Sequence, residues 1–292
     1  MAKDLADRFP AARQTLAAID QALGVPLSRV MSDGPEDELQ QTQNTQPAIL
    51  AHSAAVLAAV AGRLGSVVGA AGHSLGEYSA YLAAGSISVV DAARLVRRRG
   101  ELMQSAGRER PGAMAAVLGL AGDAVIGLCA GVSDSSGVAV AANLNAPDQT
   151  VISGDPVAVE RASEACKAAG AKRVMPLKVS GAFHSPLMAP AVPGLAAALA
   201  AVPFADPQFP VVANATAETV RSAAQAKQLL EAQLTAPVRW IDSVATLAAL
   251  APAIRFIEIG PGRVLGGLLK RIVENADYHS LGTADEVEQF LR

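Results

Sequence analysis

A serine between two glycines is the pattern in this chain with the most chemical content. Residues 72–77 read Gly-His-Ser-Leu-Gly-Glu, between an apolar run at 67–71 that predicts a buried strand and a helix-forming stretch at 78–83. Glycines that flank a serine between strand and helix are typical of a nucleophile elbow, a tight turn that exposes the serine oxygen. The pattern predicts acyl chemistry through Ser74, with the Leu75 N–H facing an oxyanion. Chance occurrence in a glycine-rich chain is the alternative, and the strand–turn–helix context weighs against it.

A serine nucleophile needs a base, and the chain contains four histidines. His52 lies in an apolar helical pattern, where a packed or surface histidine is the simpler interpretation, and His279 lies in a late strand. His73 adjoins the serine, so its side chain points elsewhere. His184 remains, and its position alone leaves a purely structural loop histidine almost equally open.

The middle of the chain predicts a small domain of its own. Over about seventy residues the order is strand, helix, strand, strand, helix, strand, which is the ferredoxin-like order. The predicted strands are 112–120, 138–142, 149–153 and 173–179, and the predicted helices are 123–130 and 156–169. We expect residues 109–180 to form this domain as an insertion, and residues 1–108 and 181–292 to form the larger one.

The larger domain alternates strands with helices, which predicts a largely parallel sheet and the α/β class. Its predicted helices span 2–23, 47–61, 78–83, 89–105, 223–234, 241–250 and 264–273, and its predicted strands 67–71, 210–213, 255–259 and 278–282. Thr283 to Glu286 read as a capping box that opens a last helix.

Composition excludes several classes of partner. The net charge of −3 gives no electrostatic reason to expect nucleic acid or an anionic membrane surface. The apolar runs at 51–61 and 195–202 are too short to span a bilayer, and no signal-peptide pattern follows Met1. Cys129 and Cys166 lack metal-ligand spacing and suit a reducing compartment. We therefore expect a cytoplasmic protein with Cys166 packed in a helix. A monomer is a separate expectation, which composition does not decide.

The chain resembles a known family along almost its whole length. The elbow hexapeptide is followed about 110 residues later by Ala-Phe-His-Ser-Pro-Leu-Met at 182–188. With these go Asn-Thr-Gln-Pro-Ala at 44–48, Arg-Arg-Arg-Gly at 97–100, Gly-Ala-Met-Ala-Ala at 112–116, Asn-Leu-Asn-Ala-Pro at 143–147 and Gly-Pro-Gly-Arg-Val-Leu at 260–265. These blocks resemble the malonyl-CoA:acyl-carrier-protein transacylases and the acyltransferase domains of polyketide synthases. The resemblance implies a hydrolase-like α/β domain with a ferredoxin-like insertion.

The resemblance implies a catalytic dyad of Ser74 and His184 with no carboxylate third member. The family orients its histidine through a backbone carbonyl in a Gln-Leu pair, which here falls on Gln233 and Leu234. No metal or redox cofactor is implied, and malonyl-CoA is the substrate.

The resemblance also assigns an arginine to the substrate. Arg99 matches the family residue that holds the free carboxylate of a malonyl group, and a guanidinium fork suits a carboxylate. A solvated helix face is the alternative reading of 97–99, and we expect it to hold for Arg97. Gln46 and Asn143 are lesser candidates for lining the pocket, with structural roles as open as functional ones.

Two residues imply selectivity for malonyl. In the family, phenylalanine before the histidine, here Phe183, and leucine after the serine, here Leu75, accompany malonyl substrates. A bulky ring beside His184 leaves little space for an α-methyl group.

The start of the chain departs from the family pattern. The family opens with a short strand and a Gly-Gln-Gly-Ser-Gln loop that donates a second oxyanion N–H, whereas Met1 to Leu5 resemble the stretch just after that loop. A downstream methionine taken as the start and a shortened protein both remain open. We expect such a chain to transfer slowly and to expose a strand edge, because one oxyanion donor is typically worth about 10²–10³ in rate.

Malonyl transfer from malonyl-CoA to an acyl carrier protein is therefore the leading hypothesis. A serine hydrolase or thioesterase of the same fold is one rival, and Arg99 argues against it. A weakly active subunit that binds the carrier protein is the other.

Overall fold

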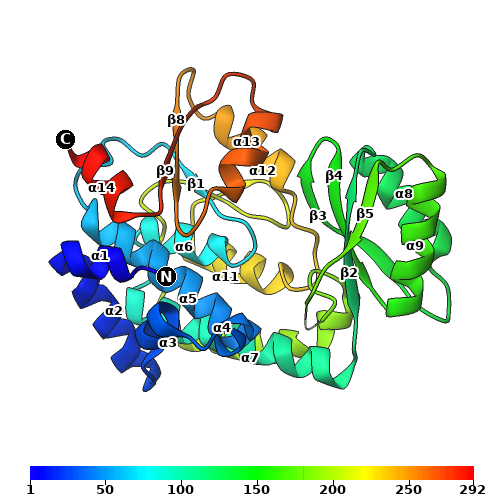
Figure 1. The fold of residues 1–292 in the computed structure, drawn as a ribbon, viewed down its shortest axis with the longest axis horizontal. Coiled ribbons are helices and arrows are strands. Elements are labelled where there is room, and N and C mark those ends of the chain that lie inside the picture. Colours follow the sequence, from blue (N-terminus) through cyan, green and yellow to red (C-terminus); the bar gives the residue numbers. More distant parts are fainter. Residues whose placement is uncertain (180) are drawn as a thin grey trace.

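The computed structural model describes residues 1–179 and 181–292, and Figure 1 shows a large body of helices and short strands beside a smaller sheet with two helices. The helices before the elbow are α1 (Lys3–Arg8), α2 (Pro10–Leu23), α3 (Leu27–Asp33), α4 (Glu36–Gln40) and α5 (Thr42–Ala59). After it come α6 (Gly76–Ala83), α7 (Val89–Glu109), α8 (Gly122–Val132), α9 (Pro156–Ala168), η1 (Pro186–Ala191) and α10 (Val192–Ala201). The last four are α11 (Ala223–Ala232), α12 (Trp240–Ala248), α13 (Val264–Ile272) and α14 (Ala284–Leu291).

The large core forms around α5, which packs against α2 and α7. Its buried face includes alanines and Leu50, and Pro47 lies within the helix. The helix predicted over 2–23 is two helices instead, because Phe9 is extended before Pro10, which starts α2. No described helix is both long and apolar enough to cross a bilayer.

The strands of the large body form two separate short sheets. In the first, β1 (Ala70–Ala71) pairs in parallel with β6 (Val211–Val212), which pairs antiparallel with β7 (Thr219–Val220). In the second, β8 (Arg255–Ile259) pairs in parallel with β9 (Asp277–Leu281). The α/β class is confirmed, but the buried strand predicted over 67–71 is wrong, since only its last two residues are strand.

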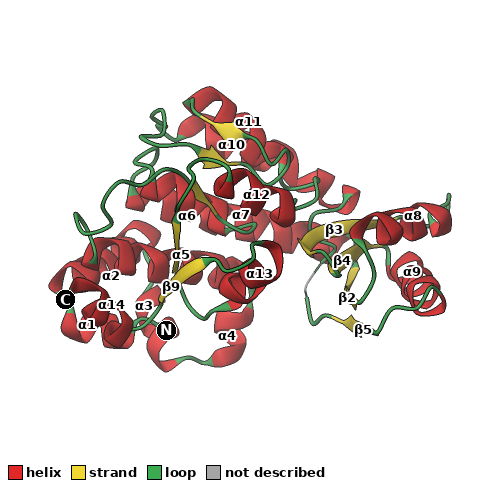
Figure 2. Ribbon diagram, turned by 90° about the horizontal axis from the view of Figure 1, so that it is seen from above, coloured by secondary structure: helices red, strands yellow, loops and turns green. Residues whose placement is uncertain are grey.

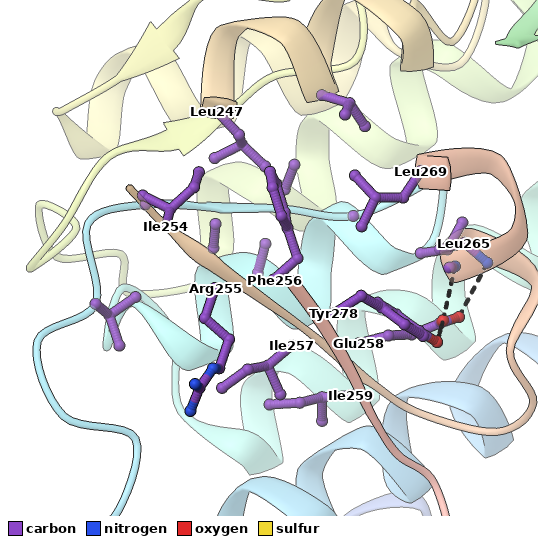
Figure 3. A pocket seen from close by; sticks show the side chains of 18 of the residues that line it. Leu247, Ile254, Arg255, Phe256, Ile257, Glu258, Ile259, Leu265, Leu269 and Tyr278 are labelled. Carbon is purple, nitrogen blue, oxygen red and sulfur yellow. Dashed lines mark hydrogen bonds between the residues drawn. The ribbon is translucent and has the colours of Figure 1, made fainter. Parts of the chain in front are cut away.

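An apolar groove separates the two sheets. It encloses about 1260 Å³ and is lined by residues 63–73 on one side and by 251–261 on the other. Figure 3 shows Phe256, Ile254 and Leu247 around it, with Glu258 bonded to Tyr278 and to backbone N–H groups of α13. Within the described residues β1 pairs only with β6, and β8 only with β9, so both strands are sheet edges.

The smaller unit has the predicted ferredoxin-like order. Its strands are β2 (Ala113–Leu118), β3 (Ala139–Ala146), β4 (Gln149–Gly154) and β5 (Arg173–Pro176), and they form one antiparallel sheet in the order β3-β4-β2-β5. Figure 2 shows α8 and α9 beside this sheet, and their buried residues share one core with it. The exact division at residues 108/109 and 180/181 stays a prediction.

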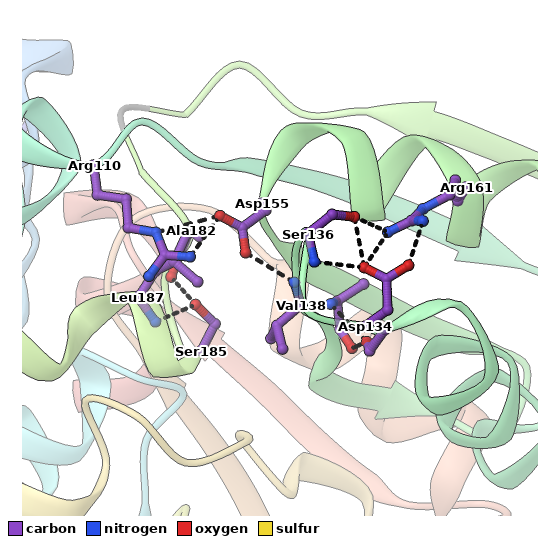
Figure 4. Close-up of polar contacts among 11 residues, drawn as sticks. Arg110, Asp134, Ser136, Val138, Asp155, Arg161, Ala182, Ser185 and Leu187 are labelled. Atoms are coloured by element: carbon purple, nitrogen blue, oxygen red, sulfur yellow. Dashed lines mark hydrogen bonds and ion pairs between the residues drawn. The ribbon is translucent and has the colours of Figure 1, made fainter.

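Polar contacts join the smaller unit to the end of α7. Arg110 pairs with Asp155 at 2.8 Å, and Asp155 also accepts the N–H of Val138 (Figure 4). On the returning chain, Ser185 donates to the carbonyl of Ala182 at 2.6 Å. The Arg110–Asp155 pair holds the end of α7 against the smaller unit, and the Ser185–Ala182 bond shapes the returning segment that carries His184.

Several short elements were not anticipated from the sequence. The helices α3, α4, η1 and α10 and the strand β7 carry few residues, or a composition of alanine and proline without a clear period. The capping box at Thr283 and Glu286 is confirmed, with both reciprocal bonds formed. Strand β8 has the predicted limits.

The exposed edge next to β1 generates a solubility prediction. Val67 and Val68 are 36% and 41% exposed beside this edge, a configuration that favours edge-to-edge association. We expect Val68→Lys to reduce light scattering during a slow thermal ramp, because a charge there opposes strand pairing. Val157→Lys, on helix α9 and 60% exposed, is the matched control and should change scattering little. Equal effects of the two variants would contradict a role of the edge.

Candidate active site

The elbow holds Ser74 in a left-handed conformation between β1 and α6. Its φ is 52°, a region that costs energy for a residue with a side chain. A Cβ on Gly72 would lie 1.9 Å from backbone atoms of Gly76, so glycine is required at 72. A Cβ on Gly76 itself would meet nothing within 4 Å. Of the two glycines that flank Ser74, only Gly72 is therefore sterically required.

The serine hydroxyl lies against an imidazole. Ser74 Oγ is 2.7 Å from His184 Nε2, and His184 Nδ1 is 3.0 Å from the backbone carbonyl of Gln233. A carbonyl only accepts, so Nδ1 carries the proton and Nε2 is left to accept from the serine. The structure thus brings together the serine, the histidine and the carbonyl that the resemblance implied, and His184 has a φ of 56° in doing so.

The imidazole is held in its neutral form. His184 is 4% exposed, and burial is the main cause that lowers its pKa to about 3. The positive charge of Arg99 is the second cause, and the bond to the Gln233 carbonyl opposes both. A neutral imidazole beside a hydroxyl is the protonation state that a general base needs.

A cation lies beside the serine in the same site. Arg99, on α7, is 1% exposed and donates from Nη2 to Ser74 Oγ at 3.1 Å and to Gln233 Oε1 at 2.9 Å. Its Nη1 donates to Gln46 Oε1 at 2.5 Å, and its Nε is buried without a partner. No described carboxylate oxygen lies within 4.0 Å of this guanidinium. Burial lowers its pKa, and the carboxylate of Glu77, which lies beyond 4.0 Å, offsets only part of this desolvation cost.

The remaining predicted site residues are Gln46, Phe183, Leu75 and Asn143. Gln46 contacts Arg99, and Phe183 packs between the main core and residues of the small sheet. The Leu75 N–H makes no hydrogen bond among the described residues, which leaves it free to donate. Asn143 is buried on β3 and bridges the backbone of Val238, with no side-chain bond to the serine or the histidine.

Two buried residues of the site were missed by sequence reasoning. Asn214 accepts the Ser74 N–H at 2.7 Å and donates to the Gly72 carbonyl at 2.8 Å. Glu77 accepts from Gln233 Nε2 at 2.7 Å and from the Asn214 N–H at 3.0 Å. A signal for Asn214 was available, because it follows β6 closely and side chains at the carboxyl ends of parallel strands meet.

The other candidate side chains lie as expected, with one exception. His52 Nε2 contacts the Gly282 carbonyl, His73 Nε2 contacts Asn145 Oδ1, and Cys166 is buried in the small core. The exception is Arg97, which is not a freely solvated residue: its guanidinium bonds Asn44 and the carbonyl of Gln43. The described residues contain no group of three or more His, Cys, Asp or Glu side chains that could hold a metal ion.

An α/β fold with a serine on an elbow, a histidine base and a free N–H at the helix start defines a class of acyl-transferring proteins. The chain belongs to the acyl transferase domain family, whose model matches residues 1–288. It is 43% identical over 272 residues to the malonyl CoA-acyl carrier protein transacylase of Bacillus subtilis (strain 168), with 93% of this chain and 86% of that protein covered.

Solved structures agree with this assignment. The acyl carrier protein S-malonyltransferase of Vibrio cholerae superposes with a TM-score of 0.94 at 41% identity, covering 99% of this chain and 94% of that one. A malonyl-transacylase solved in complex with a type II polyketide-synthase acyl carrier protein superposes with a TM-score of 0.94 at 42% identity, covering 100% and 94%. The fold expected from the resemblance, a hydrolase-like core with a ferredoxin-like subdomain, is thereby confirmed.

The environment of His184 generates a prediction about its charge. Its pKa is lowered from 6.5 to about 3, so its imidazole should stay neutral as the pH falls from 7 to 5, while the unfolded chain takes up a proton. Histidine-labelled protein should show an imidazole, identified by its absence in His184→Gln, whose ¹⁵N resonances do not titrate over this range. Titration of that signal near pH 6.5 would contradict the buried neutral base.

Proposed function

We propose that this protein transfers a malonyl group from malonyl-CoA to the phosphopantetheine thiol of an acyl carrier protein through an acyl-enzyme on Ser74. The relatives with this activity cover nearly the whole chain, and the site has the groups that the reaction needs. The protein acts without a metal or redox cofactor and works in the cytoplasm as a monomer. Asn143, Gln46 and Phe183 line the acyl pocket in this proposal.

In the first half-reaction Ser74 Oγ attacks the thioester carbonyl carbon of malonyl-CoA. His184 Nε2 takes the hydroxyl proton as the C–O bond forms, and the Leu75 N–H donates to the oxyanion. Breaking the C–S bond releases the CoA thiolate, which takes the proton back from the imidazolium. The Gln233 carbonyl holds the imidazole through Nδ1 and stabilises the transient positive charge.

In the second half-reaction the carrier-protein thiol replaces CoA. His184 removes the thiol proton, the thiolate attacks the malonyl ester, and the C–O bond to Ser74 breaks. The serine oxygen recovers its proton from His184, which restores the free enzyme. The large and small units, divided at residues 108/109 and 180/181, hold the acyl group between them.

The single observation that carries the proposal is the buried guanidinium of Arg99 beside Ser74 Oγ. It lies 3.1 Å from the nucleophile, it has a buried Nε–H without a partner, and it has no described carboxylate within 4.0 Å. A substrate with a free carboxylate two bonds beyond the thioester carbonyl would supply the missing anion. A plain esterase has no use for such a cation, which is why the hydrolase rival is weaker.

Intact-mass analysis after mixing with malonyl-CoA tests the proposal. We expect a malonyl adduct that persists in buffer and disappears on addition of holo acyl carrier protein, with malonyl-carrier protein formed. The Ser74→Ala variant should fold and form no adduct, because the elbow tolerates the smaller side chain. Rapid loss of the adduct to water would indicate a hydrolase, and absence of any adduct would indicate a binding subunit.

Replacing the arginine should change substrate preference. We expect Arg99→Ala to lower kcat/KM for malonyl-CoA roughly 30-fold to a few thousand-fold, which corresponds to about 2–5 kcal/mol of activation free energy. The reason is that the charge-assisted pair between the guanidinium and the malonyl carboxylate is removed from a desolvated site. Acetyl-CoA, which has no free carboxylate, should lose much less. Arg98→Ala, an exposed neighbour on the same helix, is the control. Equal losses for the two thioesters would return Arg99 to a structural role.

A further inference from the structure

Glu77 is a buried carboxylate that the acyl-transfer scheme does not use. It lies in the first turn of α6, three residues after the serine, and is 0% exposed. Its Oε2 accepts both of its hydrogen bonds, from Gln233 Nε2 at 2.7 Å and from the Asn214 N–H at 3.0 Å. Its Oε1 is buried without a partner. One oxygen of this carboxylate therefore accepts all of its hydrogen bonds.

The Gln233 side chain is oriented by this oxygen. Its Nε2 donates to Glu77 Oε2 and to the Ser74 carbonyl at 3.0 Å, which turns Oε1 toward Arg99 Nη2 at 2.9 Å. The flipped amide would place NH₂ against a guanidinium and a carbonyl against a carboxylate, two contacts between like groups. Glu77 thus decides which end of the amide faces Arg99.

The same oxygen also anchors the elbow. The Asn214 N–H that Glu77 accepts belongs to the residue whose side chain bonds the Ser74 N–H and the Gly72 carbonyl. Asn214 and Gln233 are both 0% exposed, so water does not replace these bonds if one partner is withdrawn. The nucleophile and the cation are therefore tied to a single acceptor.

We propose that Glu77 is a positioning residue, which acts through Oε2 to hold Gln233 and Asn214 so that Arg99 and Ser74 keep the spacing that a malonyl group requires. This rests on the proposed function. Glu77 acts because Oε2 accepts two hydrogen bonds, and not because the carboxylate is negatively charged. Arg99, Tyr78 and Tyr81 are the charged and titratable side chains that influence this carboxyl besides its partners, and burial raises its pKa to about 7. A proton on the unpartnered Oε1 leaves both bonds to Oε2 intact.

Two substitutions of Glu77 distinguish the position of its acceptor oxygen from the charge of its carboxylate. Glu77→Gln keeps an oxygen that can accept both N–H groups but removes the charge, whereas Glu77→Asp keeps the charge but withdraws the oxygen by one methylene. We expect Glu77→Asp to lower kcat/KM for malonyl-CoA by about 10–100-fold, because misplacement of about 1 Å in a catalytic site can cost 10²-fold. The loss for acetyl-CoA should be smaller, so the malonyl-to-acetyl ratio falls. Glu77→Gln should recover most of the malonyl rate and the ratio.

A second carboxylate supplies the control. Glu258, on β8, also accepts from two N–H groups, in this case the backbone N–H groups of Leu265 and Gly266. Glu258→Asp should lower stability and leave the malonyl-to-acetyl ratio unchanged. A loss in Glu77→Gln with retention in Glu77→Asp would overturn the proposal in favour of a counter-charge to Arg99. An unchanged ratio in Glu77→Asp would overturn it in favour of a merely structural carboxylate.

Two further measurements keep the proposal decidable. If Glu77→Asp does not fold, the pH profiles of kcat/KM decide: those of Glu77→Gln and the parent protein should coincide between about pH 6 and 8, and a divergence overturns the proposal. If the parent protein forms no malonyl adduct, the proposed function fails by itself. Crystal structures of the two variants then test the positioning, which predicts a reoriented Gln233 amide in Glu77→Asp alone; an unmoved amide overturns it.

Discussion

The rest of the site depends on one constraint, the burial of a guanidinium without a paired anion. Arg99 is 1% exposed, and the oxygens that accept its hydrogen bonds are neutral, those of Gln46, Gln233 and Ser74. The carboxylate of Glu77 favours its charge only from beyond 4.0 Å. Tyr78 adds the face of its ring, 5.5 Å from the guanidinium carbon. Neutral acceptors bond Nη1 and Nη2 but leave the Nε–H without a partner and most of the desolvation cost in place. The site therefore has an affinity for a carboxylate in direct contact, which no described residue supplies.

The same charge shapes the acid–base chemistry next to it. Burial is the main reason why the His184 imidazole remains neutral, and the cation beside it acts in the same direction because it disfavours a second positive charge. Burial raises the pKa of Glu77, and Arg99 opposes this rise. The two pKa shifts have opposite effects on the stability of the folded protein. As the pH falls, the lowered pKa of His184 decreases this stability below about pH 6.5, whereas the raised pKa of Glu77 increases it below about pH 7. When a substrate carboxylate arrives, it reduces the influence of Arg99 on both groups.

Sequence reasoning succeeded where chemistry is encoded locally. The elbow, the ferredoxin-like order and the limits of β8 follow from spacing within one segment. It failed for the strand over 67–71, because apolar residues beside an open edge look the same as residues inside a sheet. His184 could be placed beside Ser74 only through the family resemblance, since 110 residues and a second sheet separate them.

Glu77 and Asn214 show why the remainder of the site was hidden. Asn214 belongs to no motif and Glu77 only closes the elbow hexapeptide, and each matters through a backbone N–H or a single oxygen, which a residue type does not reveal. Their function arises because the turn at Ser74 and the end of β6 meet, so that one acceptor and one amide satisfy three backbone groups. A buried acceptor that serves several donors fixes geometry more firmly than separate pairs would, because no member can move without leaving another unsatisfied. In this site the nucleophile is strained by its turn and the cation is short of an anion, and this shared bonding is what keeps both in place.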